Sequence, residues 1–304
     1  MPIDLMPVVR AAALDRVVTT AECVRAGVTR FEVQRLAREG RLHRLTRGGW
    51  STEPPDDATD RHLLTTLAIL RRHGGRSGAG AQSALAVWGL PLVHADLSRV
   101  ILVRASGTTT RRGTDYTVWG AQGRLVTCQR PPVVTSAVLT TSLATAVVHA
   151  GLVCGSDTAL CAADAALRAG RLSRDDLVGA LARIPAGSKG VSQVRRALAC
   201  ADGRHESPGE SLTAQLCRAL GYELEPQFEI GPWRADFRIV GSHVLIEFDG
   251  KVKYGEGTDV FQEKRREDDL RRRGFVVVRL VWADLYRPDV VRARIEQALK
   301  GAAA

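Results

Sequence analysis

Four side chains in the last third of the chain have the types and spacing of a divalent-metal site: Asp236, Glu247, Asp249 and Lys251. Side chains alternate along a strand, so Glu247, Asp249 and a continuing Lys251 point to one face of an apolar run. Charges on such a face are expensive to bury without a purpose. If the preceding strand pairs with this one, Asp236 approaches both acids. Clustered carboxylates repel one another and invite a hard cation, Mg²⁺ or Mn²⁺. A water on that cation can attack a phosphodiester while the lysine orients it.

The elements around these residues are predicted to form one compact unit over residues 204–300. Ser207, Pro208 and Glu210 occupy the N-cap, first and third positions expected at the start of a helix. The apolar patterns after this helix predict, in order, strands at 225–230, 234–240 and 243–249, a charged helix at 259–273, a strand at 275–282 and a helix from 288 to about 299. The expected order is therefore αβββαβ followed by a last helix.

A resemblance to known nucleases rests on these same residues. Asp236, followed after a gap by Asp249-Gly250-Lys251, resembles the P-D…(D/E)-x-K pattern of restriction-type nucleases. The runs E-S-P-G-E-S, R-A-D-F, I-E-F-D-G-K-V-K-Y and V-V-V-R-L-V-W-A-D-L resemble an actinobacterial family related to very-short-patch-repair endonucleases. The resemblance implies a restriction-endonuclease-like core and four acidic metal ligands, Glu210, Asp236, Glu247 and Asp249.

The chain also departs from that pattern. Ala235 stands where the pattern has proline, and Lys251 lies in the stretch where the repair enzymes use a catalytic histidine. A mismatch-repair specificity therefore does not carry over. For Glu210 the alternative stays open that it is only a helix-capping acid.

Residues 1–52 predict a winged helix-turn-helix. Thr20 and Thr29 are expected to cap helices at 21–26 and 30–39, and 41–50 alternates apolar and basic residues around a Gly-Gly turn. In the second helix the inward side is expected to comprise Phe31, Val33, Leu36 and Ala37. The side chains expected to contact DNA are Arg30, Gln34, Arg35, Arg38, Arg41, Arg44 and Arg47. This part resembles the N-terminal domain of AbiEi-type antitoxins; the alternative is a helical domain with a solvated basic face.

Charge is distributed unevenly along the chain. The net charge is +10, yet residues 204–300 hold 17 basic and 17 acidic side chains. The whole excess lies in residues 1–203, where 26 basic side chains stand against 16 acidic ones, and a basic front end favours a polyanionic partner.

The remaining patterns assign no chemistry. Residues 58–200 predict a mixed α/β middle domain whose role stays open, with the glycine-rich run 74–80 as a turn. The six cysteines contain no C-x-x-C pair, which indicates reduced thiols. No signal peptide is evident, and the uncharged stretch 131–156 contains Thr, Ser and His, so a cytoplasmic protein without a membrane span is expected.

The sequence thus predicts an α+β multidomain protein: a Mg²⁺- or Mn²⁺-dependent DNA endonuclease with a DNA-binding front end, acting in DNA repair or phage defence. The alternative is a DNA-binding transcriptional regulator or antitoxin whose nuclease-like fold is not catalytic. RNA stays open as a substrate, because a hydrolytic metal site does not by itself distinguish the sugar. The oligomeric state, including a homodimer, also stays open.

Overall fold

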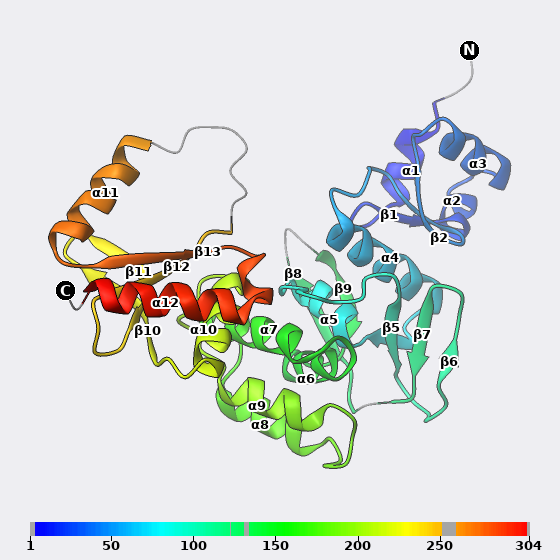
Figure 1. Ribbon diagram of the computed structural model, residues 1–304. Coiled ribbons are helices and arrows are strands. Elements are labelled where there is room, and N and C mark those ends of the chain that lie inside the picture. Colours follow the sequence, from blue (N-terminus) through cyan, green and yellow to red (C-terminus); the bar gives the residue numbers. More distant parts are fainter. Residues whose placement is uncertain (1–3, 122, 131–133, 251–259, 303–304) are drawn as a thin grey trace. The chain divides into compact units, whose positions relative to one another are not determined.

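The computed structural model describes residues 4–121, 123–130, 134–250 and 260–302. The chain divides into two compact units, one of residues 1–162 and 172–195 and one of residues 163–171 and 196–304. Helices and three sheets are all present, which confirms the α+β class (Figure 1). Among the described residues no helix has the length and apolar character needed to cross a membrane. The division into three domains at residues 52–58 and 200–204 stays a prediction.

The first unit begins with three helices and a small antiparallel sheet of order β1-β3-β2. These elements are α1 (Met6–Ala12), β1 (Val17–Thr19), α2 (Thr20–Arg25), α3 (Arg30–Arg38), β2 (His43–Thr46) and β3 (Gly49–Ser51). Their core includes the fully buried Val33 and Leu36 of α3. Phe31, expected on the inward side, is instead 71% exposed. Residues two apart on a helix point in nearly opposite directions, so Val33 in the core directs Phe31 outward.

The helix caps of this region differ from expectation at one position. Thr19, not Thr20, caps α2, and its side chain accepts a hydrogen bond from the backbone N–H of Glu22. Glu22 lies three residues after Thr19 and returns a bond to the Thr19 backbone, which completes a capping box. Thr29 caps α3 in the same way with Glu32, as predicted.

The rest of the first unit surrounds a mixed six-stranded sheet of order β6-β7-β5-β4-β9-β8. Its strands are β4 (Ser77–Ala79), β5 (Val100–Arg104), β6 (Arg111–Arg112), β7 (Tyr116–Trp119), β8 (Val126–Arg130) and β9 (Val134–Thr140). Its helices are α4 (Ala58–His73), α5 (Ala81–Trp88), α6 (Leu143–Cys154) and α8 (Arg174–Ala182), while α7 (Ser156–Arg168) and α9 (Val191–Ala199) extend into the second unit. The run 74–80, expected to be a turn, contains β4. Glycine is required there, because a Cβ on Gly78 would lie 2.9 Å from the backbone of Leu139.

The second unit is built on a four-stranded sheet of order β10-β11-β12-β13, in which only the β12–β13 pair is parallel (Figure 1). Its elements are α10 (Pro208–Ala219), β10 (Leu224–Ile230), β11 (Trp233–Ile239), β12 (Val244–Phe248), α11 (Val260–Arg272), β13 (Val276–Leu280), the 3₁₀ turn η1 (Asp284–Tyr286) and α12 (Pro288–Ala302). Every helix and strand expected after residue 204 is present, with ends that differ by a few residues.

Candidate active site

The two faces of the four-stranded sheet bury different apolar clusters. On one face Ile246 packs with Cys217 of α10 and Ile295 of α12. On the other face Leu245 packs with Leu270 of α11. Since side chains alternate along β12, Glu247 follows Leu245 to the α11 face. The sequence pattern predicted that Glu247 lies on the face opposite Ile246 and Phe248.

Asp236 lies where the alternation of β11 changes. Ala235 belongs to the cluster on the α11 face, whereas Phe237 belongs to the cluster on the α10 and α12 face. A regular strand would point both residues to one face. The residue between the pairs Pro226↔Phe237 and Phe228↔Ala235 on β10 is Gln227, whose φ of 57° is unusual for a side chain larger than glycine. Both strands are therefore irregular at the level of Asp236.

This irregular position places the Asp236 carboxylate in a poorly solvated setting among other acids. Its Oδ2 accepts a hydrogen bond of 2.7 Å from the backbone N–H of Phe248. Burial raises the pKa of Asp236 to about 6, opposed by that hydrogen bond and reinforced by the charges of Glu210 and Glu247. Arg266 acts in the opposite direction, more weakly. The structure thus brings three of the predicted acids, from α10, β11 and β12, into one electrostatic cluster.

Glu210 is buried at the start of α10 and serves the fold as well as the cluster. Ser207 caps the helix by accepting from the backbone N–H of Glu210. The Glu210 Oε2 accepts from the backbone N–H of Glu206 at 2.8 Å and from the Gln227 amide at 2.9 Å. A Cβ on Gly209 would lie 1.9 Å from the Phe248 ring, so this glycine lets the helix start close against β12. Glu210 therefore does act as a capping acid. It accepts from the backbone N–H of Glu206, whereas in a standard capping box the donor would be the N-cap residue Ser207.

Glu247 is held by two arginines that the sequence analysis did not single out. Arg266 of α11 forms a two-pronged contact with its carboxylate, including a bond of 3.2 Å from Nη1 to Oε2. The Nε of Arg279 lies 3.7 Å from the same Oε2, and Arg279 also pairs with Glu267 at 2.8 Å. Gln227, which donates to Glu210, and these two arginines are thus the groups that hold the acids of the cluster in place. The register of β12 with β13 places Arg279 opposite Glu247, whereas no sequence pattern pointed to Arg266.

The last two predicted residues lie at and beyond the end of β12. The backbone N–H of Asp249 donates to the carbonyl of Leu280 at 2.8 Å, which continues the pairing of β12 with β13 by one residue. Asp249 follows Phe248, whose own N–H contacts Asp236. Lys251 lies outside the described residues.

The donor chemistry of the cluster fits a hard divalent cation, with one qualification from the geometry. Within residues 4–121, 123–130, 134–250 and 260–302, no three His, Cys, Asp or Glu side chains form a ready-made metal cage. Mg²⁺ is commonly bound through one or two carboxylates together with water and substrate phosphates. A half-buried carboxylate destabilised by desolvation and by neighbouring carboxylates, as Asp236 is, favours such a cation.

The residues expected to contact DNA are arranged on α3 and on the β2–β3 hairpin of the first unit. Arg30, Gln34 and Arg38 are exposed on α3. Arg44 on β2 and Arg47 in the hairpin turn are exposed as well. The remaining two are engaged with acids: Arg35 lies 3.7 Å from Glu39, and Arg41 lies 2.5 Å from Asp4. The exposed Phe31 joins the α3 face, with the Arg38 guanidinium 6.0 Å from its ring centre.

Comparison with known proteins gives distant relatives. No family model matches the chain. It is 27% identical to two uncharacterized proteins from two strains of Mycobacterium tuberculosis, over 90% of this chain and 97% of each relative. Among solved structures it is similar to the catalytic domain of the homing endonuclease I-Bth0305I, with a TM-score of 0.28 and 18% identity over 32% of this chain and 97% of that domain. It is also similar to a M. tuberculosis protein of known crystal structure, with a TM-score of 0.39 and 16% identity over 69% of this chain and 78% of that one. The resemblance to antitoxin and very-short-patch-repair families stays a prediction.

Proposed function

We propose that the chain is a metal-dependent endonuclease that hydrolyses DNA at the acidic cluster of its second unit. The observation that carries the proposal is the state of Asp236, a half-buried carboxylate whose pKa is raised to about 6 beside Glu210 and Glu247. Perturbed carboxylates of this kind gather where a fold holds charge for chemistry and not for stability. The αβββαβ order of the second unit supports a restriction-endonuclease-like core.

Each residue of the proposed site has a distinct task. Asp236 and Asp249 would hold Mg²⁺ or Mn²⁺, with Glu247 as a further ligand and Glu210 as a support for Asp236. When bound, the cation supplies Lewis acidity and lowers the pKa of its water. Gln227 holds the Glu210 carboxylate in place through its amide. Arg266 and Arg279 neutralise Glu247 and keep it near Asp236. Lys251 is proposed to orient the attacking water.

The first unit is proposed to supply DNA binding through a winged helix. In this proposal α3 is the recognition helix, with Arg30, Gln34 and Arg38 toward base edges, and the β2–β3 hairpin is the wing, with Arg44 and Arg47 toward phosphates. Exposed cationic side chains on one helix and an adjacent hairpin support this role. Arg35 and Arg41 are given smaller roles, because Glu39 and Asp4 already engage them.

The test is cleavage of supercoiled plasmid, single-stranded DNA and RNA with Mg²⁺, with Mn²⁺ and with EDTA. Wild type should nick or cut DNA only with a divalent cation, and Asp236→Asn should reduce the rate by about 100- to 1000-fold. Asp289→Asn, an exposed acid on α12, is the matched control and should cut normally. Thermal unfolding with added Mg²⁺ gives a readout that does not need activity: the midpoint should rise for wild type but not for Asp236→Asn. Cleavage by Asp236→Asn at the wild-type rate would refute the site.

A second function is supported by the arginines around Glu247. Two guanidinium groups on one carboxylate make a salt-bridged cluster that is complete without a metal. This arrangement favours a DNA-binding regulator or antitoxin with a non-catalytic second unit. A gel shift in EDTA separates the two functions: a regulator should bind one defined duplex site tightly and cut no substrate under any metal condition.

A further inference from the structure

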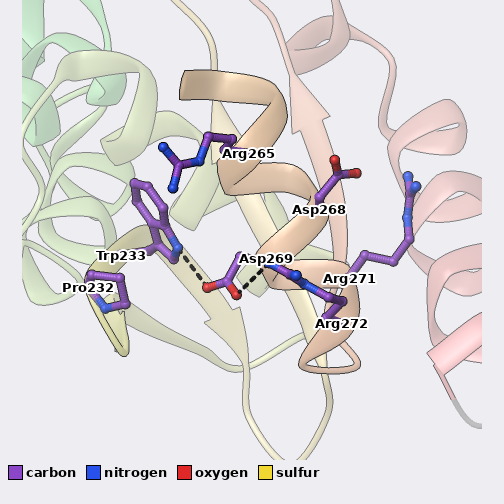
Figure 2. Close-up of a pocket in the computed structure, with 7 residues that line it drawn as sticks. All are labelled: Pro232, Trp233, Arg265, Asp268, Asp269, Arg271 and Arg272. Carbon is purple, nitrogen blue, oxygen red and sulfur yellow. Dashed lines mark hydrogen bonds and ion pairs between the residues drawn. The ribbon is translucent and has the colours of Figure 1, made fainter. Parts of the chain in front are cut away.

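A hollow of 1130 Å³ lies beside α11, and none of the residues of the acidic cluster lines it (Figure 2). The β10–β11 turn contributes Pro232 and Trp233 to its lining. Helix α11 contributes three arginines and two aspartates. Hollows of this size accept organic ligands, and a mixed aromatic and cationic lining limits which ligands fit. We name it the Trp233 hollow.

Trp233 is fixed in place by two kinds of contact. The half-buried ring packs with the cluster that contains Ile230 and Leu270. Its Nε1–H donates to Oδ2 of Asp269 at 3.0 Å, a bond drawn in Figure 2. The turn before it is tight, with Gly231 at a φ of 58°. An aromatic ring held this way loses little conformational freedom when a second ring stacks on it.

The charges around the ring favour an anion. Asp269 is largely neutralised, because besides Trp233 it accepts from Arg273 at 3.0 Å and from Arg272 at 3.3 Å. Among the described residues, Arg265 and Arg271 have no hydrogen-bonding or ion-pair partner. Figure 2 shows Arg265 on the Trp233 side of α11 and Arg271 on the other side of the helix. Two available guanidinium groups therefore flank the lining.

We propose that the Trp233 hollow binds an unpaired nucleotide of single-stranded DNA, with the base stacked on Trp233, a flanking phosphate on Arg265 and a phosphate further along the strand on Arg271. A fixed aromatic ring in a cationic groove is the arrangement by which proteins bind single strands without reading their sequence. This inference rests on the proposed function, because it gives the nuclease unit a second place to hold its substrate. It predicts a preference for DNA with a displaced or frayed strand.

The experiment measures binding by fluorescence anisotropy in EDTA, where cleavage is stopped, with a fluorescein-labelled single-stranded DNA oligonucleotide and with the matching duplex. Trp233→Leu retains apolar packing but no stacking surface, so it should weaken single-strand binding by at least about 5-fold. Trp233→Phe should stay close to wild type, because it keeps an aromatic face. Both variants are first checked for a wild-type circular dichroism spectrum.

Substitution of the two arginines is an independent test that does not alter apolar packing, because both side chains are exposed. Removing Arg265 and Arg271 together should weaken single-strand binding several-fold and flatten its dependence on salt concentration. Arg292→Ala, an exposed arginine on α12, carries the same type of change elsewhere in the unit and should have no effect. Wild-type affinity in both Trp233→Leu and the double arginine variant would overturn the proposal.

The outcome is separable from that of the nuclease proposal. If no substrate is cut but single-strand binding depends on Trp233, the hollow stands and the nuclease assignment fails. If DNA is cut normally while Trp233→Leu and the double arginine variant bind like wild type, the nuclease stands and the hollow fails. Asp289→Asn, an exposed acid on α12 outside both sites, should bind the single strand as tightly as wild type.

Discussion

The acidic cluster of the second unit and the α3 face of the first unit (Arg30, Phe31, Gln34 and Arg38) differ in how their charged side chains are buried and paired. Around Asp236 the carboxylates are buried or half-buried, and Glu210, Asp236 and Glu247 each accept a hydrogen bond from a neighbour. On α3, Arg30 and Arg38 are exposed and have no acidic partner among the described residues. The acidic cluster is held together by tertiary contacts, and its crowded carboxylates lower the stability of the fold. The arginines of α3 make no such contacts, and the fold only positions them. Substitutions should therefore change stability in one region and only binding in the other.

The largest effect is expected from breaking the Glu247 pair. Arg266→Met leaves a carboxylate that is only 13% exposed with Arg279 as its remaining cation, at 3.7 Å. An uncompensated buried charge is strongly destabilising, so the free energy of unfolding should fall by about 2–3 kcal/mol. Arg265→Met, one position away and exposed, should stay within about 0.5 kcal/mol of wild type. Urea denaturation of both variants measures the difference; equal stability would show that Glu247 does not need Arg266.

The next effect comes from the close approach that positions Glu210. Gly209→Ala places a methyl group 1.9 Å from the Phe248 ring, and the ring must move with β12. Such overpacking should destabilise the protein by about 1–3 kcal/mol. Gly179→Ala in α8 is the control, because nothing lies within 4 Å of its Cβ and a helical alanine is favoured by about 0.5–1 kcal/mol. Opposite signs for the two glycines are expected in thermal melts, and a stabilised Gly209→Ala would show that α10 and β12 are not tightly packed.

A smaller effect of opposite sign is expected at Asp236 itself. The pKa of Asp236 is raised to about 6 in the folded protein, so its protonated carboxyl contributes to the free energy of unfolding at low pH. That contribution is lost as the pH rises through 6, because the folded protein must then hold the charged carboxylate. Asp236→Asn keeps an oxygen to accept from Phe248 and removes the charge. Because solvent screens the half-buried carboxylate, the substitution should raise the free energy of unfolding by about 1–2 kcal/mol at pH 7. Below about pH 4 the variant and the wild type should be equally stable. Unfolding at both pH values tests this; a variant less stable than wild type at pH 7 would mean that the carboxylate is satisfied in the fold.

How much of this could be predicted from the sequence depends on the distance between the partners. The start of α10 and the placement of Glu247 on the face opposite Ile246 follow from residues a few positions apart, and the structure has both. Thr19 could also have been chosen over Thr20, since the T-x-x-E spacing to Glu22 selects it. Phe31 was misplaced because an aromatic residue was assigned to the core by its type, although Val33 and Leu36 already fixed the buried direction.

The contacts that complete the acidic cluster were not predictable by the same means. Arg266 reaches Glu247 from the next helix, and the Gln227 amide reaches back to Glu210 from β10. Neither pair has a periodic spacing, because tertiary packing sets it. The sequence does not indicate the left-handed backbone of Gln227, because the residue there is neither glycine nor asparagine. Residue types thus revealed the acids, while the groups that hold them emerged only from the fold.

The smallest effect on stability, and the sharpest test of the comparison, is expected on α3. Arg30→Ala and Arg38→Ala should each leave the free energy of unfolding within about 0.5 kcal/mol of wild type, because both side chains are exposed. If α3 contacts DNA phosphates, each substitution should lower duplex affinity and reduce the slope of log affinity against log salt by about one. Arg41→Ala should change that slope less, since Asp4 at 2.5 Å already offsets its charge. Titrations of duplex DNA at several salt concentrations distinguish the three variants. A slope that is unchanged in Arg30→Ala and Arg38→Ala would make the α3 face a solvated surface, and would leave Arg44 and Arg47 of the β2–β3 hairpin as the remaining exposed candidates of the first unit for contact with DNA.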